Sequence, residues 1–74
     1  MEEKELKERL MKESPEFKEV FELHQKYEKE LDTFKQKSFL SDEDRIEIME
    51  LKKKKLALKD KMYFMMTEYS KSLQ

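Results

Sequence analysis

His24 is the only imidazole in this 74-residue sequence, and Glu28 follows it four residues later. On a helix this spacing places both side chains on one face, where they could contribute to a metal site or a pH switch. A metal site normally needs three or four protein ligands, and the sequence has no cysteine and no second histidine. We therefore interpret His24 as part of a helix seam and expect no metal or other cofactor.

Lysines form the second group with possible chemistry. Residues 52–61 hold six lysines and one aspartate, a net charge of +5, whereas residues 41–50 hold five acids and one arginine, a net charge of −4. A basic stripe can bind the phosphates of nucleic acid. Consecutive lysines on a helix, however, point around most of its circumference. Weak nucleic-acid binding through this segment is thus the less favoured alternative, with phosphate contacts from Lys52, Lys53, Lys54 and Lys59.

The composition does not favour catalysis. The sequence has no glycine for a phosphate-binding loop and no cysteine for a thiolate nucleophile. Its 18 acidic residues guarantee close carboxylate pairs, but pairs on solvated helices lack the concave pocket that shifts a pKa. No apolar run approaches the roughly 18 residues that span a bilayer. We expect a cytoplasmic protein that is not an enzyme.

Apolar residues repeating with a helical period predict an all-α single domain over residues 1–74. Ser14 and Pro15 read as an N-cap and a first helical residue, and Ser41 with Asp44 reads as a capping box. These signals predict helices over 2–13, 15–37 and 42–71. Because the second connection is short, the two longer helices are expected to form an antiparallel, coiled-coil-like hairpin after a short N-terminal helix.

The last helix carries two apolar stripes. The first contains Ile48, Leu51, Leu58, Met62, Met65 and Tyr69, and the second contains Met49, Leu56, Tyr63 and Met66. Together they span roughly half the helix circumference, more than one facing helix covers. Lys55 interrupts the first stripe at the level where the hairpin brings His24, so these two residues are expected to form a polar layer that fixes the register.

The wide apolar face predicts a protein–protein interface. In the hairpin, Met65, Met66 and Tyr69 of the 42–71 helix extend past the start of the 15–37 helix. Either the N-terminal helix folds back over them or a partner covers them. Phe64 points away from the hairpin and is the best single candidate for a partner contact. We expect a homodimer with a four-helix arrangement through Phe64, Met65, Met66 and Tyr69. An unidentified protein partner and attachment to a membrane surface are the other readings.

Two sequence motifs also resemble a known family. Ser14-Pro15-Glu16-Phe17 is followed by His24, and the lysine- and leucine-rich run from Leu51 ends in Lys59-Asp60. In this order and spacing the chain resembles the YdcH-like family of small bacterial proteins from about Ser14 to Thr67. The resemblance implies a short helical hairpin with no assigned activity, cofactor or catalytic residue.

Overall fold

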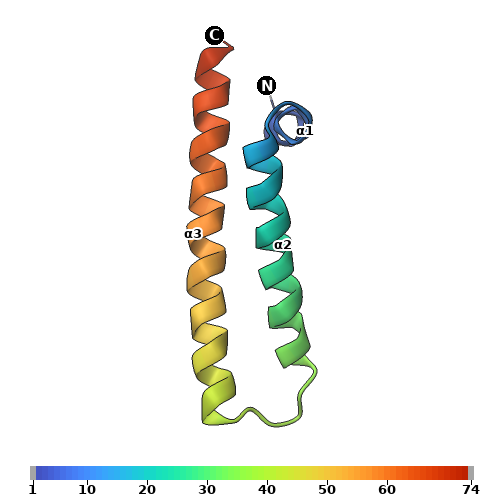
Figure 1. Ribbon diagram of the computed structural model, residues 1–74, viewed down its shortest axis with the longest axis vertical. Helices are drawn as coiled ribbons and strands as arrows, with labels where there is room; N and C mark the ends of the chain where they lie inside the picture. The colour runs from blue at the N-terminus through green and yellow to red at the C-terminus, as the bar shows by residue number, and fades with distance from the viewer. Residues whose placement is uncertain (1, 74) are drawn as a thin grey trace.

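The structure, a computed structural model, describes residues 2–73, which form three α-helices and no strand (Figure 1). The helices are α1 (Glu3–Glu13), α2 (Pro15–Lys35) and α3 (Asp42–Ser72). The expected all-α class is thereby confirmed. Each helix begins and ends within two residues of the positions expected from the capping signals and the apolar period.

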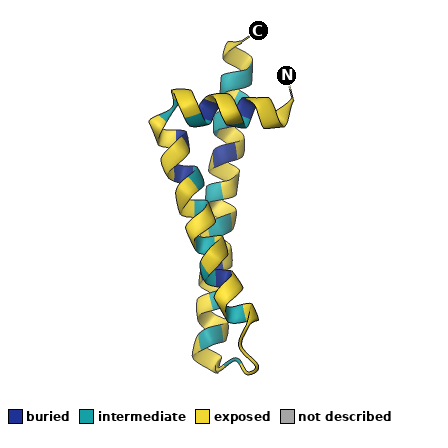
Figure 2. Cartoon of the chain, turned by 90° about the vertical axis from the view of Figure 1, so that its right-hand side faces the viewer, coloured by how far each residue is buried: buried dark blue, intermediate teal, exposed yellow. Residues whose placement is uncertain are grey.

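A sharp bend separates α1 from α2. Ser14 lies between them in an extended conformation, and its hydroxyl oxygen accepts a hydrogen bond from the Phe17 N–H at 3.1 Å. Pro15 occupies the first turn of α2, where its missing N–H costs nothing, but it cannot continue α1. As a result, α1 runs across the other two helices instead of extending α2 (Figure 2).

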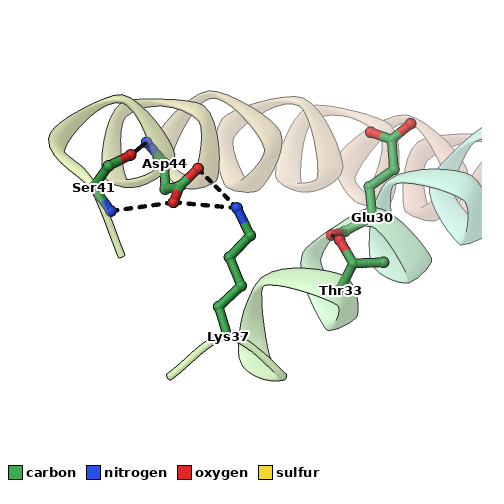
Figure 3. A network of polar contacts seen from close by, with 5 residues as sticks. All are labelled: Glu30, Thr33, Lys37, Ser41 and Asp44. Atoms are coloured by element: carbon green, nitrogen blue, oxygen red, sulfur yellow. Dashed lines mark hydrogen bonds and ion pairs between the residues drawn. The ribbon is translucent and has the colours of Figure 1, made fainter. Parts of the chain in front are cut away.

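A capping box starts α3. The Asp44 N–H donates to the Ser41 hydroxyl, and the Ser41 N–H donates to the Asp44 carboxylate, each at 3.1 Å (Figure 3). From the turn before it, Lys37 reaches the same carboxylate at 3.2 Å. The hydrogen bond from the Ser41 backbone and the bond from Lys37 lower the pKa of Asp44. These contacts tie the turn of residues 36–41 to the first residues of α3.

Ion pairs join α2 to α3, which lie side by side (Figure 1). Glu16 pairs with Lys61 at 3.5 Å, and Glu28 pairs with Lys55 at 3.7 Å. As the residue number rises along α2, the number of the paired residue on α3 falls. The resulting rod measures 50 × 20 × 16 Å.

The main core lies at the end of the rod where the three helices meet (Figure 2). Phe17 is fully buried there, at the start of α2. The other buried members of this cluster come from all three helices: Leu6, Leu10, Val20, Met62 and Met66. Leu31 and Leu51 are buried farther along the α2–α3 pair. Burial is thus concentrated where α1 adds a third helix.

Candidate functional site: an exposed apolar stripe on α3

Five large apolar side chains remain exposed along α3. Met49, Leu56 and Tyr63 follow one another at intervals of seven residues and are 58%, 60% and 70% exposed. With 3.6 residues per turn they fall within about 40° of one another around the helix. Ile46 and Phe64 lie beside them on the same side and are also exposed. We call Ile46, Met49, Leu56, Tyr63 and Phe64 the α3 stripe.

The α3 stripe is exposed because α2 is a single helix. Leu51 and Met62, from the first of the two apolar stripes, are buried, and Leu58 packs against the core. Residues of the second stripe lie farther around α3, beyond the reach of α2. In that second stripe Met66 is the buried member, and it lies at the end of the rod where α1 adds a third helix.

A groove of about 550 Å³ opens between α2 and α3 next to the α3 stripe. Apolar residues from both helices and from the turn line it: Leu31, Phe34, Leu40, Ile48 and Leu56. Charged residues line it as well: Glu28, Asp32, Lys35, Lys52, Lys55 and Lys59. Leu56 belongs both to the groove and to the α3 stripe, so the exposed apolar surface is continuous from one to the other.

Of the expected interface residues, Met66 is buried and Met65 and Tyr69 are half-buried, while Phe64 is 64% exposed. The first three pack into the cluster that contains Leu6 and Leu10 of α1. A partner surface at these three positions stays a prediction, although α1 of the same chain packs against them. The expected alternative, in which the N-terminal helix folds back, is the arrangement the structure has.

Tyr69 also makes a polar contact with α1. Its hydroxyl donates a hydrogen bond to the carboxylate of Glu13, the last residue of that helix. This hydrogen bond is the main cause that raises the pKa of Tyr69 above its ordinary value, and Arg9 opposes it. The contact ties α1 to α3 beside the apolar cluster and gives Tyr69 a role inside the chain.

Glu28 lies beside the expected polar layer of His24 and Lys55, because it forms an ion pair with Lys55. His24 is half-buried, and its Nε2 atom is buried without a hydrogen-bond partner among residues 2–73. Burial is the largest cause that lowers the pKa of His24; Glu28 opposes this shift, and three lysines add to it, Lys55, Lys59 and Lys7. Residues 2–73 contain no group of three metal-ligating side chains, so His24 has no partners for a metal site within that range.

The lysines of α3 point in several directions. Lys52, Lys53, Lys54 and Lys59 are exposed, as a phosphate contact requires. Lys52 and Lys59 line the groove, whereas Lys54 lies on another side of α3, with its Nζ 5.8 Å from the centre of the Tyr27 ring. Lys55 and Lys61 are held in ion pairs with α2. The positive charge is therefore spread around the helix.

These features define a small all-helical protein with an unpartnered apolar helix face. Over residues 17–66 the chain matches the family described as "Protein of unknown function (DUF465)". This match covers more than half of the chain, so the protein belongs to that family, with which the YdcH-like resemblance is compatible. No curated protein and no solved structure matches the chain. Among the described residues, no helix is both long enough and apolar enough to cross a membrane.

Proposed function

We propose that this protein is a non-enzymatic interaction module that self-associates as a homodimer. In this proposal α2 and α3 act as an antiparallel, coiled-coil-like hairpin, and the α3 stripe is the surface that a second copy covers. The observation that carries it is the exposure of Met49, Leu56 and Tyr63 at seven-residue intervals. A coiled-coil helix carries apolar residues at two positions of each seven-residue repeat, and Met49, Leu56 and Tyr63 occupy one of these positions.

The free energy gained by burying the α3 stripe supports this proposal. Exposed apolar residues that are scattered singly need no explanation, whereas a contiguous exposed patch indicates an interaction site. Fully burying a Leu- or Met-sized side chain contributes about 1.5–3 kcal/mol. A dimer would bury most of the α3 stripe of both copies, a gain comparable with the roughly 4–15 kcal/mol that association costs. We therefore expect association that depends on concentration.

The distribution of shifted pKa values supports a role without catalysis. His24, Asp44 and Tyr69 have shifted pKa values, but they lie in three separate places, the seam, the helix cap and the contact with α1. Each shift has a structural cause in its own surroundings. Catalytic sites instead bring perturbed groups together in one cleft.

Light scattering coupled to size exclusion tests self-association. We expect the mass of the wild-type chain to rise toward that of a dimer with concentration, and Leu56→Glu to keep the chain monomeric with unchanged helix content. Phe39→Ser is the matched control, because Phe39 is exposed on the turn and lies outside the α3 stripe. A wild-type chain that stays monomeric at every concentration, or a Leu56→Glu variant that still dimerises, would refute the proposal.

Nucleic-acid binding is the second candidate. The observation in its favour is the exposure of Lys52, Lys53, Lys54 and Lys59 on one helix. Fluorescence anisotropy at low salt, with single- and double-stranded DNA and RNA, tests this function. It is supported by binding that weakens with salt and with Lys→Gln substitution at these positions. No binding, or binding that the substitutions leave unchanged, removes it.

A further inference from the structure

Exposed charges divide residues 42–61 of α3 into two halves of opposite sign. In the first half Asp42, Glu43, Glu47 and Glu50 stand with Arg45, and all five are exposed. In the second half Lys52, Lys53, Lys54 and Lys59 stand with Asp60, and these are exposed as well. The remaining charges of residues 42–61 are held within the chain, since Asp44 contacts Lys37, and Lys55 and Lys61 contact α2. Outside these ion pairs each half thus carries a net charge of three, negative first and positive second.

This division favours one orientation of a second copy on the α3 stripe. Two parallel α3 helices in register would place acidic half beside acidic half and basic half beside basic half. Two antiparallel helices would place each acidic half beside the basic half of the partner. Like charges side by side cost several kcal/mol across an interface, whereas complementary potentials favour association and fix the register. Charge therefore selects the antiparallel orientation.

One antiparallel register satisfies both a central apolar contact and the exceptional charges. In an antiparallel pair, residues meet when their numbers have the same sum. If Met49 faces Leu56 of the other copy, Arg45 comes to the level of Asp60. Arg45 is the one exposed base in the acidic half, and Asp60 is the one exposed acid in the basic half. One register thus packs the centre of the α3 stripe and also pairs the two charges that depart from the pattern.

We propose that two copies of this chain pair through their α3 stripes in antiparallel orientation, about a two-fold axis crossing α3 between Lys52 and Lys53. This inference rests on the proposed self-association and specifies its geometry. Each copy contributes the same surface, as a two-fold interface requires. Met49 of each copy packs on Leu56 of the other. The acidic half of each α3 lies beside the basic half of the other except at the two-fold axis, where Lys52 meets Lys53.

The groove offers a second geometry for a dimer, with α2 of one copy lying over α3 of the other. Its charged lining holds four lysines and two acids, a net positive charge. Two such grooves facing each other would bring like charges together, which disfavours this arrangement. The α3 pairing brings Lys59 to the level of Ile46, within the acidic half of the other copy, and Lys52 to the level of Lys53 at the two-fold axis.

Disulfide crosslinking tests the orientation directly, because the chain has no native cysteine. Mixed Met49→Cys and Leu56→Cys chains are expected to form the mixed disulfide well ahead of either homodimer under mild oxidation. Glu47→Cys is the control, as it is exposed on α3 but outside the α3 stripe. Equal or faster formation of the Met49→Cys or Leu56→Cys homodimers would overturn the antiparallel register, and so would crosslinking of Glu47→Cys as fast as the mixed pair.

A charge swap tests the register independently. Arg45→Glu and Asp60→Lys are each expected to weaken the dimer several-fold, because each puts like charges together at two places in the dimer. The double variant is expected to regain wild-type affinity. Single variants without effect, or a double variant without recovery, would overturn the register.

The two proposals fail in different ways. If the wild-type chain dimerises but neither the crosslinks nor the charge swap follow the pattern, self-association stands and the antiparallel geometry is wrong. A wild-type chain that is monomeric at every concentration overturns both. Circular dichroism of each variant checks that α3 remains helical, and all of the substituted positions are exposed.

Discussion

The two ends of α3 carry similar apolar residues but have different surroundings. Near its C-terminal end, Met66 is buried where α1 adds a third helix, in the same cluster as Met62. In its first two thirds, Met49 and Leu56 belong to the same apolar stripe as Met66, yet they are exposed. The difference is the presence of a third helix. The apolar pattern of a helix indicates how much of its surface is suited to burial. How much is buried within the chain depends on which other helices pack against it.

The largest expected effect on stability comes from a substitution at the end of the rod where the three helices meet. Phe17 is fully buried where the three helices meet. Replacing a buried phenylalanine by alanine typically costs about 3–5 kcal/mol. We expect Phe17→Ala to leave the chain largely unfolded, because a domain of this size has little stability to lose. Urea denaturation followed by circular dichroism measures this.

Phe64→Ala is the matched comparison on the exposed part of α3. Phe64 has the same side chain but is largely exposed, so we expect a change of less than about 0.5 kcal/mol in the free energy of unfolding of the monomer. Equal destabilisation by the two substitutions would show that the two regions do not differ in the way described.

A substitution in α1 is expected to change both regions at once. Leu10 is buried against the cluster that contains Met62 and Met66. Leu10→Ala should lower the free energy of unfolding by about 2–3 kcal/mol, the low end for such substitutions because α1 is short and close to the chain end. Loosening α1 also exposes Met66, so binding of a hydrophobic dye should rise. Unchanged stability and dye binding would mean that α1 does not cover α3 in solution.

A smaller effect is expected at the bend before α2. Ser14 accepts a hydrogen bond from the Phe17 N–H at the start of that helix. Ser14→Ala should cost about 1 kcal/mol, the usual value of an N-cap. Ser38→Ala, on the exposed turn, is the control and should be close to neutral. Thermal melts of both variants measure the difference, and equal melting temperatures would contradict a role for the cap.

The smallest effect concerns pH. Because burial lowers the pKa of His24 in the folded chain, the unfolded chain binds this proton more tightly. The contribution of His24 to stability is therefore present above the unfolded pKa of about 6.5 and decreases as the pH falls below that value. Groups from all three helices act on it: Glu28 raises the pKa, whereas Lys7, Lys55 and Lys59 lower it.

The measurement is the free energy of unfolding of wild type and His24→Gln between pH 7.5 and 5.5. Wild type should lose more stability over this interval than the variant. The low pKa of Asp44 acts only at more acidic pH, below the usual carboxylate range, so the two effects are separable. Identical slopes for the two chains would remove His24 as the cause.

Local signals in the sequence predicted most of the fold. Ser14 with Pro15 and Ser41 with Asp44 fix helix starts through contacts within four residues, so they can be read without tertiary structure. The docking of α1 could not be read in this way. A helix with only Leu6, Leu10 and Met11 as apolar residues fits a surface of its own chain or of another copy equally well.

The candidate site was predicted only in part, for the same reason. The sequence indicated two apolar stripes on α3 and placed the expected partner surface at Met65, Met66 and Tyr69, against which α1 packs. Met49, Leu56 and Tyr63 were read as the weaker stripe, and they are the ones left exposed. Which stripe stays uncovered depends on where α1 docks.

The reversal of the chain at residues 36–41 places the turn at one end of a 50 Å rod and residues 2 and 73 at the other (Figure 1). Probes at the turn and near either terminus would therefore report on opposite ends of the molecule. In an antiparallel dimer centred between Lys52 and Lys53, the two turns lie about 30 Å apart along α3 at 1.5 Å per residue. A parallel dimer brings them together. Spin labels at Ser38 would turn the direction of pairing into a single interspin distance.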